Sequence, residues 1–398
     1  MDKSLRKWFG WGLLNLAIVA FYGMVMRYKI AFDFPFFEQK NLLHAHSHFA
    51  FSGWISQFLY AGLALIVFPY LDKVKQRKYH VLLALNLLAS FGMLIAFTVQ
   101  GYKAVSISFS TFSIFIAVAF AITFIKDYRF LPKSHPSKKW TTVALTLNIL
   151  SAIGPLFLAY MMATRNIDHN YYLGSVYYYL HFQYSGWFFF GSMALVANYL
   201  PSISLDKYFR IFALTVIPTF FLSVLWLKLP SWLYIITVLV TFLQFFAWLV
   251  LALNLWKCFK PKAKTRVSYF FYVSAIALTL KFTLQAVSVI PYLSQLVFGF
   301  RPIVIAYLHL VLLGVYTLFV IGFLFEQKVI QPSKPAKLMA FIFVIGVLLN
   351  ELFLGIQGVM AFAYLPVPFI NEMLLGASVI LLIGSFGLFC VEGNRQEN

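Results

Sequence analysis

Three histidines, His44, His46 and His48, occupy alternate positions at the start of a long apolar run. Imidazole binds iron, copper and zinc readily, and ionisable residues inside membrane-spanning segments are rare and usually functional. If the run is a helix, His44 and His48 lie one turn apart on the same face, whereas His46 faces another direction. The spacing predicts that His44 or His48 binds a metal or haem, and that His46 is interfacial without a ligand role.

The segment that begins at His48 recurs further along the chain. His48–Trp54 reads HFAFSGW and matches HFQYSGW at His181–Trp187 in five of seven residues. A fainter copy contains His309, again five residues before a glycine. The three histidines are 133 and 128 residues apart, and recurrence at similar intervals indicates an internal repeat. We therefore expect three pseudo-equivalent units with one such histidine each.

The elements that carry these histidines are predicted from composition. With 62% hydrophobic and only 11% charged residues, the chain has too little charged surface for a soluble domain. Apolar runs of about 20 residues can cross a bilayer core of about 30 Å, and they must be helices because lipid cannot hydrogen-bond the backbone. Twelve such runs occur, near 9–27, 42–70, 79–99, 104–126, 140–162, 172–199, 207–227, 230–256, 268–290, 302–325, 337–359 and 370–390.

The sequence thus predicts an all-α polytopic membrane protein with twelve transmembrane helices in a single membrane domain over residues 1–398. Three pseudo-repeats of four helices are expected at about 1–135, 136–264 and 265–398. Most of the 31 Lys and Arg residues fall on the side that holds both termini, which predicts that both termini are cytoplasmic. This asymmetry also accounts for the net charge of +19, so the expected partner is the lipid bilayer and not nucleic acid.

This topology places His48, His181 and His309 at similar depth. Helices two, six and ten would all run from outside to inside, with each histidine in the outer half of the membrane. Three imidazoles at one level could coordinate a metal ion. The two cysteines, Cys258 and Cys390, provide neither a disulfide framework nor a CxxCH motif. Any metal is therefore expected to have nitrogen or oxygen ligands, and any haem to be bound non-covalently.

The expected chain resembles subunit I of the haem–copper oxidase superfamily in its twelve helices, its cytoplasmic termini and its histidines on helices two, six and ten. This superfamily includes cytochrome c oxidases, quinol oxidases and nitric oxide reductases. The resemblance covers the topology of the whole membrane domain, but the sequence only in the short histidine motifs. It implies that His309 and either His44 or His48 are the axial ligands of a low-spin haem, and that His181 binds copper or non-haem iron. Tyr307 stands where the family has its high-spin haem ligand, and tyrosine ligation of haem iron has a precedent in catalase.

The repeat register favours His48 as the second axial ligand, whereas the histidine-to-glycine spacing of some family members favours His44, so both are candidates. Two features depart from the family. Residues 207–227 lack the adjacent histidines that complete the copper site, and residues 360–372 lack the arginines that bind haem propionates. Oxygen reduction by the family mechanism is therefore not expected. The chain is also similar to the nitric-oxide-response family of haem- and copper-containing membrane proteins, which have twelve helices and a His-Ala-His motif.

Three functions are compatible with these residues. The favoured one is a b-type haem protein, with copper or iron as a second metal, that exchanges electrons with a quinol or a small redox protein, or handles nitric oxide or oxygen. Whether it is a divergent haem-dependent oxidoreductase is left open. The second is a non-enzymatic haem or metal carrier or sensor, and the third is a transporter. Lys281 and Glu351, midway along helices nine and eleven, could form an ion pair, a proton path or a transport site. The expected location is the bacterial cytoplasmic (inner) membrane.

Overall fold

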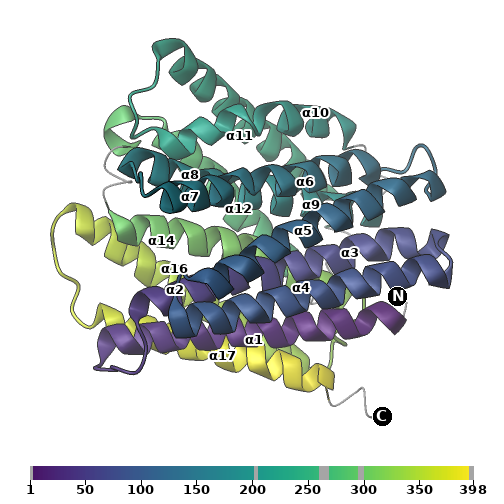
Figure 1. The fold of residues 1–398 in the computed structure, drawn as a ribbon, viewed down its shortest axis with the longest axis horizontal. Helices are drawn as coiled ribbons and strands as arrows, with labels where there is room; N and C mark the ends of the chain where they lie inside the picture. Colours follow the sequence, from purple (N-terminus) through teal and green to yellow (C-terminus); the bar gives the residue numbers. More distant parts are fainter. Residues whose placement is uncertain (1–2, 201–204, 260–268, 295–299, 394–398) are drawn as a thin grey trace. The chain divides into compact units, whose positions relative to one another are not determined.

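The computed structural model describes residues 3–200, 205–259, 269–294 and 300–393, and every regular element in these ranges is helical (Figure 1). Ten of the described helices are long and apolar enough to cross a membrane. The predicted all-α class and membrane character are confirmed.

In chain order, which the colours of Figure 1 follow, the elements are α1 (Lys3–Ala31), α2 (Gln39–Phe49), η1 (Ala50–Ser56), α3 (Gln57–Val67), η2 (Phe68–Tyr70), α4 (Lys73–Gln100), α5 (Ala104–Asp127), η3 (Tyr128–Phe130), α6 (Ser137–Ser151), α7 (Ile153–Thr164), α8 (His169–His181), η4 (Phe182–Phe188), α9 (Phe189–Tyr199), α10 (Asp206–Thr215), η5 (Pro218–Val224), α11 (Ser231–Phe259), α12 (Tyr269–Ser288), α14 (Arg301–His309), η7 (Leu310–Thr317), α15 (Leu318–Glu326), α16 (Lys334–Phe362) and α17 (Ile370–Gly393).

Two of the twelve predicted spans differ from the other ten. Residues 207–227 form α10 and η5, which are bent by 49° at their junction and count as an eleventh span only if they cross together. Pro218 starts η5, and a proline cannot continue the hydrogen bonding of the preceding helix. Residues 172–199 are helical through α8, η4 and α9, but they are not among the ten apolar spans, because tyrosines and polar motif residues lower their hydropathy. The described residues thus support ten spans, or eleven.

The chain divides into two compact units. Unit 1 combines Met1–Phe130, Tyr269–Phe271 and Tyr316–Asn398, and unit 2 combines Leu131–Ser268 and Tyr272–Val315. In unit 1, α1 packs against α2, η1 and α17, and α16 packs against α17. In unit 2, α6 packs against η4 and α9, and both α10 and η5 pack against α11. The division into three pseudo-repeats stays a prediction.

Unit 1 joins the two ends of the chain. Arg6 in α1 pairs with Glu392 in α17, with 2.7 Å between Nη2 and Oε1, and it also donates to the carbonyl oxygen of Val329 at 3.2 Å. Glu392 is almost fully buried, and a buried carboxylate is tolerated when it is paired. Nearer the middle of the unit, Trp54 Nε1 donates to Thr317 Oγ1 at 2.9 Å. These contacts link segments that are far apart in the sequence.

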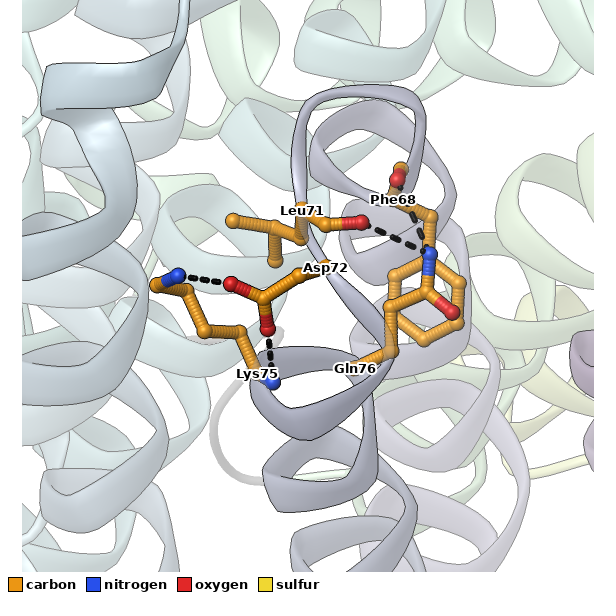
Figure 2. A network of polar contacts seen from close by, with 5 residues as sticks. All are labelled: Phe68, Leu71, Asp72, Lys75 and Gln76. Atoms are coloured by element: carbon orange, nitrogen blue, oxygen red, sulfur yellow. Dashed lines mark hydrogen bonds and ion pairs between the residues drawn. The ribbon is translucent and has the colours of Figure 1, made fainter.

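A turn of two residues connects η2 to α4, and Figure 2 shows the polar contacts that hold it. Asp72 caps α4: one carboxylate oxygen accepts from the backbone N–H of Lys75 at 2.8 Å, and the other pairs with the Lys75 ammonium. Gln76 Nε2 donates to the carbonyl oxygens of Phe68 and Leu71, both at 3.1 Å. Hydrogen bonds from Lys75 hold the pKa of the Asp72 carboxyl below its usual value. The turn therefore satisfies the first free N–H groups of α4.

In unit 1, α16 and α17 approach closely at Gly384, where a Cβ atom would lie 2.6 Å from the backbone nitrogen of Phe343. Small residues permit such contact between membrane helices. We expect Gly384→Ala to lower the free energy of unfolding by about 1–3 kcal/mol, because the two backbones must separate. Gly376→Ala in the same helix is the matched control, since its Cβ would meet nothing within 4 Å. Thermal unfolding in detergent should show a lower midpoint for the first variant only, and equal midpoints would contradict the close contact.

Candidate functional site

Each of the three histidine motifs continues into a π-helical segment. η1 begins two residues after His48, η4 directly after His181, and η7 directly after His309. π-Helical turns are rare and occur frequently at functional sites. Because such a turn contains an extra residue, it changes the direction in which the preceding side chains face. The copy at His309 is faint in sequence, but it shares this backbone feature with the other two.

In two of these π-segments, a backbone carbonyl oxygen accepts a hydrogen bond from a polar side chain of a neighbouring helix. Asn15 Nδ2 in α1 donates to the carbonyl oxygen of Gly53 in η1 at 2.5 Å. Ser274 Oγ in α12 donates to the carbonyl oxygen of Val315 in η7 at 2.8 Å. A π-turn disturbs the regular i→i−4 ladder, and in lipid each displaced carbonyl needs another donor. Asn15 and Ser274 supply such donors.

In the third π-segment, η4, a side chain of the motif itself, Gln183, forms hydrogen bonds with a neighbouring helix. Gln183 Nε2 donates to Asn148 Oδ1 at 3.0 Å and to Ser151 Oγ at 2.8 Å, both in α6. Asn148 follows Asn15 by 133 residues, the same interval that separates the first two histidine motifs. These asparagines were not among the residues predicted from sequence, although their shared interval in apolar segments was a usable signal.

In unit 1, His44 and His48 lie beside two aromatic rings at the end of α4. The ring of His48 stacks on Phe97 with centroids 4.5 Å apart, and its Nε2 is 2.8 Å from the hydroxyl oxygen of Tyr102. The ring of His44 meets Tyr102 edge to face at 4.6 Å. His44 Nε2 is buried and has no hydrogen-bond partner among the described residues. Of the two candidate ligands, His44 is the one whose Nε2 is buried without a hydrogen-bond partner among the described residues, whereas Nε2 of His48 contacts Tyr102.

Other histidines have structural contacts. His46 Nδ1 donates to the carbonyl oxygen of Val19 at 3.1 Å, which ties α2 to α1. His80 Nδ1 accepts from Trp8 Nε1 at 2.7 Å, near the start of α4. His169 is exposed at the first residue of α8.

In unit 2, His181 is completely buried at the end of α8. Its Nε2 lies 2.8 Å from the carbonyl oxygen of Val216, just after α10. Because a carbonyl oxygen only accepts, Nε2 must carry the hydrogen, and Nδ1 keeps the lone pair of a neutral ring. In the described part of the chain Nδ1 is buried without a hydrogen-bond partner. An imidazole with one N–H on a backbone carbonyl is oriented as metal-binding histidines usually are.

His309, at the end of α14, is also oriented by a hydrogen bond to a backbone carbonyl. Its Nδ1 donates to the carbonyl oxygen of Ile305, one turn earlier, at 2.8 Å, so Nε2 carries the lone pair. Tyr307 lies two residues before it, and its ring meets the buried ring of Tyr184 edge to face, with centroids 5.9 Å apart. Unit 2 therefore holds two oriented imidazoles and a tyrosine pair on the motif-bearing helices.

The predicted metal ligands are distributed over both units, with His48 in unit 1 and His181 and His309 in unit 2. Among the described residues, no three His, Cys, Asp or Glu side chains are grouped closely enough to hold a metal ion. The convergence of the three imidazoles stays a prediction.

Lys281 and Glu351, the two charged residues that the sequence places midway along apolar helices, have partners within their own units. Lys281 in α12 is buried, donates to Ser185 Oγ in η4 at 3.3 Å, and places Nζ 4.2 Å from the centroid of the Phe282 ring. Glu351 in α16 accepts from Asn350 Nδ2 at 3.1 Å. Lys281 and Glu351 belong to different units, and an ion pair between them stays a prediction.

Comparison with known proteins adds no family to this description. No protein-family model matches the chain, and no significant match was found among the curated proteins.

Proposed function

We propose that the chain is a twelve-span protein of the bacterial inner membrane, with cytoplasmic termini, that binds b-type haem and a second metal, copper or iron. It would exchange electrons with a quinol or a small redox protein, or handle nitric oxide or oxygen. The observation that supports this proposal concerns His44, four residues before the first histidine motif, and His181, in the second: His44 Nε2 and His181 Nδ1 are buried without a hydrogen-bond partner among the described residues. An unpaired buried nitrogen is costly, and coordination to a metal would satisfy its lone pair.

His44 and His309 are the proposed axial ligands of the haem. His44 is preferred to His48 because Nε2 of His48 is engaged with Tyr102. In His309, the N–H on Nδ1 bonds a backbone carbonyl, so the lone pair that would bind the haem iron is on Nε2. A bound haem would supply one-electron redox chemistry, for which the protein sets the axial ligands and the surrounding polarity.

His181 and Tyr307 are the proposed ligands of a second centre. The carbonyl oxygen of Val216 fixes the ring of His181, so that Nδ1 presents its lone pair. Outer hydrogen bonds of this kind also make an imidazole a stronger ligand. Tyr307 would contribute a phenolate oxygen, and imidazole nitrogen with phenolate oxygen suits iron or copper.

A visible spectrum of the detergent-purified protein, with metal analysis for iron and copper, tests this function. We expect the sharp reduced α-band of a haem with two imidazole ligands. His309→Ala should remove it while leaving membrane insertion intact, and His169→Ala, which changes an exposed histidine, should keep it. A colourless, metal-free wild-type protein would contradict the proposal and favour a transporter. A haem that reacts with neither quinol, nitric oxide nor oxygen would instead indicate a carrier or sensor.

A further inference from the structure

Among the described residues of unit 2, Lys281 is the most deeply buried one with a charged side chain. Its side chain lies in α12 with 3% exposure, and its only hydrogen bond to a described residue of the unit goes to Ser185 Oγ at 3.3 Å. The ring of Phe282 covers one side of the ammonium, with 4.2 Å between Nζ and the ring centroid. An ammonium has three N–H donors. Two of them are therefore without an acceptor in the described part of unit 2.

The sequence of unit 2 offers no carboxylate to neutralise this charge. The unit contains only two acidic residues, Asp168 and Asp206. Asp206 pairs with Lys139 at 3.0 Å on the surface. Asp168 accepts from the backbone N–H groups of Asn170 and Tyr171 and thereby caps α8. A buried ammonium without a counter-ion is strongly unfavourable, so the charged form of Lys281 needs an anion from outside the unit.

A second buried donor lies beside Lys281. Gln285 follows it by four residues, so the two side chains share one face of α12. Gln285 is 7% exposed, and its amide can donate two hydrogen bonds. Ser185 Oγ, which accepts from Lys281, still has its own hydrogen to donate. The three residues present an ammonium, an amide N–H₂ and a hydroxyl.

We propose that Lys281, Gln285 and Ser185 bind a small monovalent anion, of the size of chloride, nitrite or formate, inside unit 2. A small anion supplies the negative charge that the unit lacks and accepts hydrogen bonds from all three groups. A divalent anion would bring a further buried charge with no second cation to balance it. The site does not depend on haem binding, so the failure of one proposal leaves the other standing.

Thermal unfolding of the purified full chain, titrated with sodium formate at constant ionic strength against sodium gluconate, tests the site. A ligand that binds only the folded state raises the unfolding midpoint in a saturable manner. We expect this rise in the wild type and its loss in Lys281→Met. Lys228→Met, which changes an exposed lysine of the same unit, should respond like the wild type. Binding of radiolabelled formate, measured by equilibrium dialysis, gives the same comparison without unfolding.

Two further variants keep the test decisive if Lys281→Met folds poorly. Ser185→Ala and Gln285→Leu should each raise the dissociation constant for formate by about tenfold or more, because each removes a hydrogen bond to a charged group. No saturable response in the wild type, or an unchanged response in Lys281→Met, would overturn the proposal. A response that appears only in Glu351→Gln would also overturn it, because the counter-ion of Lys281 would then be that carboxylate.

Discussion

Replacing His44 by alanine is expected to remove the haem from the purified protein, whereas replacing His48 leaves most of it bound. The reason is that His44 Nε2 has no partner within the described ranges, while His48 Nε2 is 2.8 Å from the Tyr102 hydroxyl. Losing a residue that only orients a ligand costs about 10–100-fold in metal affinity, and losing the axial ligand itself should cost more. Haem content per chain, measured as the pyridine haemochrome after purification, distinguishes the two variants.

Two controls accompany this comparison. His46→Ala changes the third histidine of the cluster, whose ring bonds Val19 on α1, and reports any general disturbance of α2. Tyr102→Phe releases Nε2 of His48 without removing either imidazole. If His48→Ala loses the haem and His44→Ala keeps it, the repeat register identifies the axial ligand and the hydrogen bonding does not.

Deleting Ala50, the first residue of η1, is expected to abolish haem binding in a chain that still enters the membrane. Each helical residue contributes about 100° of rotation and 1.5 Å of rise. Removing the extra residue of the π-segment would therefore turn His44 and His48 by about 100° relative to the second half of the helix. Phe97 and Tyr102 belong to α4 and the residues after it, and they would not follow this rotation. Haem content and the helical circular dichroism of the purified variant provide the measurement.

A compensated variant separates helix register from the loss of one side chain. Deleting Ala50 and inserting one alanine after Ser56 restores the relation between His44 and the second half of the helix, and shifts only the residues in between. Recovery of haem in this variant is the expected result. An equal loss in both variants would mean that the local side chains, and not the register, are responsible.

The membrane helices were predictable because lipid leaves the backbone no other way to pair its polar groups. Ten of the twelve predicted spans are long apolar helices within the described ranges. The two that differ contain Pro218, at the bend between α10 and η5, and the tyrosine-rich residues 172–199. His181 was singled out by its repeat, and the structure buries it completely at the end of α8, while its role as a ligand stays a prediction.

The details of the site could not be predicted because they depend on contacts between distant residues. His48 is engaged by Tyr102, 54 residues later in the chain, and no local pattern indicates this. The amino-acid composition of the π-segments does not distinguish them from ordinary helix. One of them, η1, accepts a hydrogen bond at Gly53 from the side chain of Asn15, 38 residues earlier. The orientation of His181 depends on the Val216 carbonyl oxygen, which α10 positions. Sequence reasoning therefore named candidate histidines, and the structure supplied their contacts.

In the sequence, unit 2 lies between the two main parts of unit 1, and this order has a consequence for how the protein is made. Apart from Tyr269–Phe271, the ribosome synthesises unit 2 as a continuous stretch, and its helices can assemble as they leave the insertion machinery. The first helix, α1, can pack against α2 and η1 early, but its contact with α17, which includes the Arg6–Glu392 pair, must wait until the end of the chain emerges. Until translation finishes, unit 1 stays incomplete, and a premature stop after residue 315 would leave an inserted protein in which α1 has α2 and η1 beside it but lacks α17.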